Sequence, residues 1–245
     1  MTRKRYVIVN ADDFGQSSGI NRGIVTAHEK GIVTSASLMV RWPAAAEAAA
    51  YGRAHPKLSV GLHIDLGEWA HRDGTWVPLY EVVEVGDSVA VADEVARQLG
   101  IFRHLVGKDP THIDSHQHVH LREPVRSVLL DVARELAVPL RHCSPEVAYC
   151  GAFYGQTENG VSLPGRISVE AMIGLLSALS AGFTELGCHP GEGSDLETMY
   201  RVERAQEVRV LCDPRVNAAM AALGIELRSF GELGSRAVGT QGGKG

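Results

Sequence analysis

Three kinds of feature are scarce or missing in this sequence, and each absence excludes a class of protein. The 245 residues include four cysteines without CxxC spacing, so we expect free thiols and no disulfide framework. Only a four-residue apolar run precedes Asn10, too short for a signal peptide or membrane span, which predicts a soluble, cytoplasmic protein. The formal net charge of -5, with no basic block, argues against nucleic acid as a partner.

Strand-like and helix-like apolar patterns alternate along the chain, which is long enough for one large α/β domain. Short apolar runs predict strands at residues 6–10, 35–40, 58–64, 111–115, 138–142, 183–188 and 225–230. Helical periodicity predicts helices at 19–30, 44–54, 89–106, 124–136, 168–180, 197–211 and 214–223. This alternation predicts a parallel sheet covered by helices, either a barrel or an open doubly wound sheet. We favour a single-domain (β/α) barrel-like fold that need not contain eight regular strands.

Two segments, 66–88 and 146–166, are too long to be ordinary connections. Long loops near the carboxyl ends of strands commonly shape a substrate pocket, so we expect both segments to border the site. The last twelve residues, GSRAVGTQGGKG, contain five glycines and no apolar period. We therefore predict one domain over residues 1–233 and a disordered Gly-rich tail over 234–245.

The stretch RYVIVNADDFGQ at residues 5–16 contains Asp13-Phe14-Gly15, a triplet that binds magnesium in protein kinases. A kinase places a glycine-rich loop, a strand lysine and a catalytic loop before this triplet, but only twelve residues precede Asp13. The order of motifs therefore excludes a kinase. Asp12 and Asp13 end the first predicted strand, where they could form an Asx-turn cap or a catalytic pair.

Polar clusters fall where four of the predicted strands end. They are Asp12-Asp13, His63 with Asp65 in GLHID, the run THIDSHQHVH at 111–120, and His189 in GCHPG. The carboxyl ends of parallel strands meet at one edge of a sheet, so side chains distant in sequence converge there. This convergence predicts an active site at that edge.

Histidines are concentrated in one run, where four of the eleven lie within nine residues. Every even position from His112 to His120 is histidine or aspartate, and in extended structure these positions share one face. A solvated strand face is the alternative, but a strand inside a parallel sheet should be apolar. A polar stripe there needs a metal ion or substrate to offset its desolvation, so we favour a functional site.

A catalytic metal site commonly takes about three protein ligands and leaves one position open for water. One aspartate and two histidines from different strands would supply such a set. These ligand types do not select among Zn, Fe, Co, Ni and Mn. A second aspartate beside the ligand could be the general base, and His189 could act as an acid from the opposite side.

Five motifs occur in a fixed order from about Tyr6 to Leu211: NADDFG, GIVTSASLMV, GLHIDL, THIDSHQHVH and ELGCHPG. Together they resemble the YdjC-type carbohydrate deacetylases, a family that includes chitooligosaccharide deacetylases and hopanoid-associated relatives. DSHQHVH is the most specific of these elements. The resemblance implies that residues 1–233 form a metal-dependent deacetylase domain with a (β/α) barrel-like fold. Such a domain would use one divalent metal ion, Zn, Mg or another first-row transition metal, to remove acetyl from an N-acetylated sugar.

The resemblance also implies roles for individual residues, carried over motif by motif. Asp13, His63 and His116 would be the metal ligands. Asp12 would be the general base, by further analogy with the NodB-type polysaccharide deacetylases, and His189 would be the general acid.

Four further residues receive supporting roles from the same resemblance. Asp114, His118 and His120 would orient the ligands through hydrogen bonds or bind substrate. Arg141, in PLRH, would bind a substrate oxyanion or a sugar hydroxyl group.

Two other functions stay open on the sequence alone. Another barrel metal hydrolase, an amidohydrolase or phosphoesterase, would use similar His/Asp clusters and often two metals. A non-catalytic sugar-binding module would use the same cleft without turnover. Aromatic residues in the two long segments could stack on sugar rings or pack within the loops: Trp69, Trp76, Tyr149, Phe153 and Tyr154. A symmetric homodimer is the default expectation for the assembly.

Overall fold

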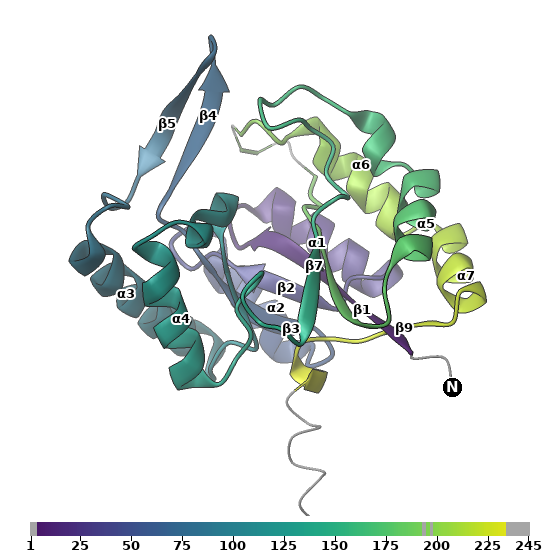
Figure 1. Cartoon of the computed structure of the whole chain (residues 1–245), viewed down its shortest axis with the longest axis horizontal. Helices are drawn as coiled ribbons and strands as arrows, with labels where there is room; N and C mark the ends of the chain where they lie inside the picture. The colour runs from purple at the N-terminus through teal and green to yellow at the C-terminus, as the bar shows by residue number, and fades with distance from the viewer. Residues whose placement is uncertain (1–3, 193–194, 197, 234–245) are drawn as a thin grey trace, which may run out of the picture.

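The computed structural model describes residues 4–192, 195–196 and 198–233, and the predicted Gly-rich tail at 234–245 lies outside these ranges. One parallel sheet forms the centre of the domain, with strand order β6-β3-β2-β1-β8-β7 and β9 paired with β1 (Figure 1). Its strands are β1 (Arg5–Phe14), β2 (Ser35–Leu38), β3 (Ser59–Ile64), β6 (Ile113–Ser115), β7 (Val147–Cys150), β8 (Gly182–Cys188) and β9 (Ile225–Leu227).

The sheet curls into half a barrel, which confirms the predicted barrel-like α/β fold with fewer than eight regular strands. The strand predicted at 138–142 is wrong, because only Leu140 bridges to Ile113 beside β6. Pro139 offers no backbone N–H, and His142 has a left-handed φ of 62°, so the ladder cannot continue. The strand next to β8 is instead β7, inside a segment predicted to be irregular.

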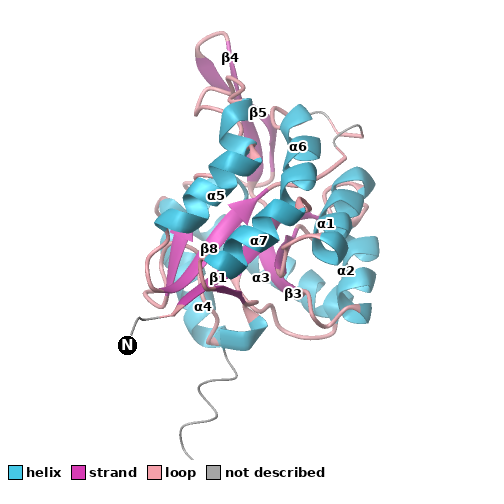
Figure 2. Cartoon of the chain, turned by 90° about the vertical axis from the view of Figure 1, so that its right-hand side faces the viewer, coloured by secondary structure: helices cyan, strands magenta, loops and turns pink. Residues whose placement is uncertain are grey.

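Helices surround the outer face of the sheet (Figure 2). They are α1 (Ser18–Lys30), α2 (Ala45–Ala54), α3 (Ser88–Val106), α4 (Val125–Leu136), α5 (Val169–Ala178), α6 (Val202–Leu211) and α7 (Pro214–Ala222). Side-chain caps set several starts: Ser17 accepts from the Ile20 N–H at α1, and Asp87 accepts from two N–H groups at α3. The predicted helix at 197–211 begins later, at Val202. None of the described helices is long and apolar enough to cross a membrane.

The two faces of β1 differ in polarity, and this difference places the site. Val7, Val9 and Ala11 belong to the main hydrophobic core, which the helices cover. Asn10 and Asp12 alternate with them and are also fully or almost fully buried, but they point into the half-barrel. The interior is therefore polar near the carboxyl ends of the strands. At the other end, an apolar plug of Ile8, Val147 and Phe230 closes it.

A β-hairpin projects from the body of the domain beside the carboxyl ends of the strands (Figures 1 and 2). It consists of β4 (Gly67–Arg72) and β5 (Thr75–Glu81), within a segment predicted to be irregular. Asp65 anchors its base, because the carboxylate accepts hydrogen bonds from Tyr80 Oη at 2.9 Å and from Trp42 Nε1 at 3.1 Å. Asp65, whose role the sequence left open, therefore has a structural function at the foot of the hairpin.

Candidate active site

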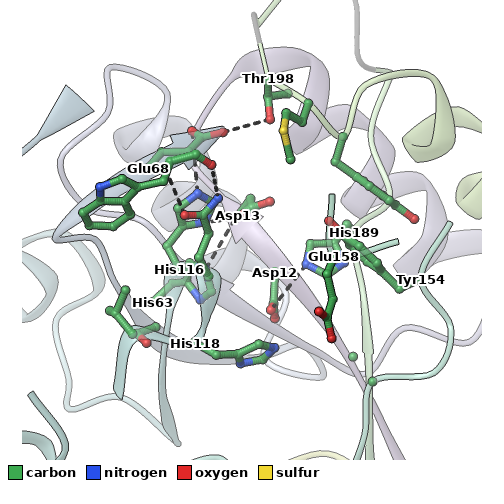
Figure 3. Close-up of a pocket in the computed structure, with 18 of the residues that line it drawn as sticks. Asp12, Asp13, His63, Glu68, His116, His118, Tyr154, Glu158, His189 and Thr198 are labelled. Carbon is green, nitrogen blue, oxygen red and sulfur yellow. Dashed lines mark hydrogen bonds and ion pairs between the residues drawn. The ribbon is translucent and has the colours of Figure 1, made fainter. Parts of the chain in front are cut away.

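A cavity of about 1020 Å³ opens at the carboxyl ends of the strands (Figure 3). Its lining contains the five residues predicted as metal ligands, base and acid: Asp12, Asp13, His63, His116 and His189. His118 also lines the cavity. The other predicted residues, Asp114, His120 and Arg141, are buried behind this lining.

The two adjacent aspartates at the end of β1 face different partners. Asp13 has a left-handed φ of 67°, a conformation that aspartate tolerates better than most residues. The turn that follows is closed by the Gln16 N–H, which donates to the Asp13 carbonyl at 3.0 Å. As a result, Asp12 points toward Arg141 while Asp13 points toward His116 and Arg204.

Asp13, His63 and His116 form a group that could hold a metal ion, with one ligand atom from each within 4.8 Å of the others. An Asp13 carboxylate oxygen lies 3.0 Å from His116 Nδ1 and 3.4 Å from His63 Nε2. On its other side, His63 Nδ1 contacts Asp114 at 2.7 Å, the carboxylate–histidine arrangement typical of metal ligands. One carboxylate and two oriented imidazoles fit a divalent cation.

Buried charges in this group offset one another. Burial disfavours the charged form of Asp13, but Arg204, 2.6 Å away, and His116 hold its pKa well below the usual value. Burial likewise opposes charge on His63, yet the carboxylates of Asp114 and Asp13 raise its pKa to about 9. In the metal-free protein, protons on the imidazoles therefore balance the carboxylates.

Arg141 does not face the cavity as a substrate group; it holds three buried carboxylates together. Its guanidinium donates to both oxygens of Asp12, at 2.6 and 2.7 Å, and also contacts Asp114 at 2.7 Å and Glu185 at 2.6 Å. Burial raises the pKa of Asp12, and the Arg141 charge outweighs this and keeps the pKa below its usual value. A second possible metal group, Asp12 with His63 and Asp114, thus already contains a cation, the guanidinium.

His189 directly follows β8 and lies across the cavity from His63 and His116. Its Nε2 lies 3.7 Å from an Asp12 oxygen, and its ring makes an edge contact with Tyr154 at 5.4 Å between centroids (Figure 3). Tyr200 makes a second edge contact with the ring, also at 5.4 Å. Burial lowers the pKa of His189 to about 4, despite the nearby Asp12. The imidazole is therefore neutral at pH 7 and able to accept a proton.

The extended stripe predicted from His112 to His120 is wrong beyond Ser115. The chain turns there into a 3-10 helix, η1 (His116–Leu121), in which Gln117 and His118 have left-handed φ values of 49° and 53°. The turn sends His116 toward Asp13, whereas His120 Nδ1 contacts Ser115 Oγ at 2.6 Å. Sequence alternation therefore predicted a region that borders the cavity, but it did not predict the directions of its side chains.

A family model described as YdjC-like protein matches residues 6–222 of the chain. The chain belongs to the YdjC-like protein family. Over 94% of its length it is 34% identical to a carbohydrate deacetylase from Geobacillus stearothermophilus, covering 98% of that relative. It is 31% identical over the same share to a chitooligosaccharide deacetylase from Serratia marcescens, covering all 100% of it. The resemblance drawn from the motifs is confirmed.

A solved structure has the same fold as this YdjC-like chain. It is a protein from Enterococcus faecalis V583 whose name proposes the cleavage of cellobiose phosphate. The superposition has a TM-score of 0.75 at 26% identity and covers 94% of this chain and 99% of the other. The fold is therefore shared over nearly the whole length of both proteins.

Three charged residues at this YdjC-like site were missed by sequence analysis: Glu68, Arg204 and Glu207. Arg204 and Glu207 lie one turn apart on α6 and are both buried, together with Glu203. Charged residues on a helix are usually solvated, so the segment VERAQEVRVL gave no warning. Glu207 accepts hydrogen bonds from the His189 backbone N–H and from Tyr200 Oη.

The five aromatic residues considered for sugar stacking all line the cavity: Trp69, Trp76, Tyr149, Phe153 and Tyr154. They come from the hairpin and from the segment around β7, the two predicted irregular segments. Phe153 is fully buried, whereas Trp76 is 52% exposed. The five aromatic residues therefore form walls of the cavity, and Trp76 is the most exposed of them.

Proposed function

We propose that the protein is a metal-dependent carbohydrate N-deacetylase, with residues 1–233 as the catalytic domain. It would hydrolyse the acetamide of an amino sugar to acetate and a free amine. The observation that supports this most is the placement of Asp13, His63 and His116 in one cavity with Asp12 and His189. The names of two relatives, carbohydrate deacetylase and chitooligosaccharide deacetylase, point to the same reaction.

Asp13, His63 and His116 would hold the metal, which supplies Lewis acidity to the amide carbonyl and to the attacking water. Asp12 takes the proton from that water, since its carboxylate is ionised and fixed by two hydrogen bonds from Arg141. His189 Nε2, 3.7 Å from Asp12, can receive this proton and pass it to the departing nitrogen. The reaction consumes one water and breaks one C–N bond, and its products are acetate and the free amine.

The substrate would be an N-acetylated oligosaccharide, glycolipid or glycoside. A cavity of about 1020 Å³ has room for more than one sugar ring. Trp69 and Trp76 on the hairpin offer apolar faces on which such rings can stack. Oligosaccharides of N-acetylglucosamine are the first candidates, because they match the name of the Serratia relative.

The test is acetate release by the metal-reconstituted protein from N-acetylglucosamine mono-, di- and trisaccharides and from glycolipids. Asp12→Asn serves as the control, and it should retain the metal but lose about a hundredfold or more in rate. Release by the native protein alone would support the proposal. Equal release by the Asp12 variant would remove Asp12 from the mechanism, and no release from any substrate would contradict the deacetylase.

A second candidate is another barrel hydrolase, such as a phosphoesterase, which the name of the Enterococcus structure brings into view. Enzymes of this kind often use two metals, whereas here Arg141 stands among the carboxylates that a second cation would need. Phosphate release from cellobiose phosphate, with two metals bound per chain, would favour this candidate. A non-catalytic sugar-binding module would bind sugar without turnover, and equally well in the Asp12→Asn variant.

A further inference from the structure

The two histidines proposed as ligands present opposite nitrogens to Asp13. His63 does so through Nε2, at 3.4 Å, and His116 through Nδ1, at 3.0 Å. The remaining nitrogen of His63 contacts Asp114 at 2.7 Å. The remaining nitrogen of His116, Nε2, is buried and has no hydrogen-bond partner among the described residues. Asp114 thus orients the His63 ring, whereas the Nε2 atom of His116 still lacks an acceptor among the described residues.

A neutral imidazole that gives one nitrogen to a metal carries its proton on the other nitrogen. A buried N–H without an acceptor is unfavourable, because the group gives up its hydrogen bond to water and gains none within the protein. His116 therefore requires an acceptor near Nε2. Glu68 offers one: a carboxylate oxygen lies 3.6 Å from His116 Nε2, slightly beyond hydrogen-bond distance (Figure 3).

Glu68 is held in this position by its surroundings. It is 5% exposed and lies at the start of β4, and its other oxygen accepts a hydrogen bond from Thr198 Oγ1 at 3.0 Å. The residues that follow Glu68 and His116 in the sequence, Trp69 and Gln117, also interact. Gln117 donates to the Trp69 carbonyl at 2.8 Å and accepts from the Trp69 N–H at 3.0 Å. The foot of the hairpin is therefore joined to the segment that carries His116.

We propose that Glu68 is a positioning residue that orients His116 for metal binding and thereby couples the metal to the docking of the β4–β5 hairpin. The inference rests on the metal site proposed above, but not on the reaction. It follows that a bound metal stabilises the hairpin against η1, and that a docked hairpin strengthens metal binding. Trp69 and Trp76, which line the cavity from this hairpin, would be held in place by the same coupling.

The test begins with calorimetric titration of Zn²⁺ into the metal-free protein. Glu68→Gln keeps the size of the side chain and an acceptor for Thr198, but removes the carboxylate from His116. We expect the Zn²⁺ dissociation constant to rise by about 10- to 100-fold. The matched control is Glu81→Gln, which removes the same charge from the other strand, opposite Gly67, and should change the constant by less than about twofold. Equal constants for native and Glu68→Gln proteins would overturn the proposal.

Two measurements do not depend on whether the variant folds. In ¹⁵N-histidine NMR spectra of the Zn²⁺-loaded native protein, His116 should carry its proton on Nε2 and bind through Nδ1. Metal on Nε2 would contradict the proposal. Hydrogen exchange of the Trp69 amide should slow when Zn²⁺ binds, and an unchanged rate would contradict the coupling to the hairpin. If Zn²⁺ binds as expected but no acetate is released, this inference stands and the proposed reaction fails.

Discussion

Histidines at the cavity wall and behind it form two groups, and the charges around them make the two groups chemically different. In one group, His63 and His116 face carboxylates, and the pKa of His63 rises to about 9. In the other group, burial and the Arg141 charge lower the pKa of His118 to about 3 and that of His120 to about 4. Among the described residues, the sets that could hold a metal ion include His63 and His116 but neither His118 nor His120. The difference shows that surrounding charge, and not residue type, distinguishes the proposed ligands.

The strongest test of this difference removes one histidine from each group and compares the affinities of the two variants for Zn²⁺. His116→Ala should weaken Zn²⁺ binding by more than about a hundredfold, because even a partner that only orients a ligand is worth about 10- to 100-fold. His118→Ala, two residues away, should leave the affinity nearly unchanged. Calorimetric titration of both metal-free variants measures this. A normal affinity for the His116 variant would move the ligand role to His118 or His120.

A second test concerns His189, which shares the low pKa of His118 but stands next to Asp12. His189→Ala should lose about a hundredfold or more in kcat, because the departing amine then lacks its proton donor. Its metal content should equal that of the native protein, since His189 is not among the proposed ligands. Deacetylation assays with metal analysis check both values. Full activity would remove His189 from the mechanism.

Metal affinity should also depend on pH, and only through the histidines that face carboxylates, His63 and His116. Binding of a divalent cation at the proposed site would require His63 to lose a proton, because, despite burial, the carboxylates of Asp114 and Asp13 raise the pKa of His63 to about 9 in the metal-free protein. Affinity therefore rises with pH, by about tenfold per pH unit below 9 for this group alone, and levels off above it. Zn²⁺ titrations from pH 6 to 9 would show the slope. His118→Ala should keep the same slope, because a group with a pKa of about 3 is already deprotonated.

The last test measures stability and not metal affinity or rate, and it concerns Glu207, a carboxyl group without an arginine at hydrogen-bond distance among the described residues. Burial raises the pKa of Glu207 from 4.5 to about 8, although Tyr200 and the His189 N–H donate to it. The folded state keeps this proton while the unfolded state loses it. Stability therefore falls as pH rises from about 4.5 to about 8, by up to about 1.4 kcal/mol per pH unit. Glu207→Gln should flatten this part of the unfolding curve, and an unchanged slope in urea titrations would contradict the assignment.

Much of the fold could be predicted from the sequence, because buried strands such as β1 and β8 have apolar runs that end in turns. The strand predicted at residues 138–142 is wrong, because Pro139 and the left-handed conformation of His142 interrupt the pairing of this apolar run. The hairpin was not predicted, since β5 has no buried residue along its length, and β7 was not predicted, since it has only four residues. Pairing with distant segments, which local pattern does not encode, decides such cases.

The same distinction applies to the site. Asp12, Asp13, His63 and His189 could be proposed because each lies at or just beyond the carboxyl end of a recognisable strand and carries a polar group where the chain should turn. Glu68, Arg204 and Glu207 could not, because a charged residue in a hairpin or helix gives no local sign of burial. Arg141 was proposed from its position at a predicted strand end, and in the structure it contacts the carboxylates of Asp12, Asp114 and Glu185.

The most direct test of the account is anomalous diffraction from crystals of the Zn²⁺-loaded protein, measured on both sides of the zinc absorption edge. We expect one strong peak, bounded by Asp13, His63 and His116, and no peak beside His118 and His120. A peak in the second histidine group would contradict it. So would two peaks of equal height with Arg141 displaced from Asp114, the result expected of a two-metal hydrolase.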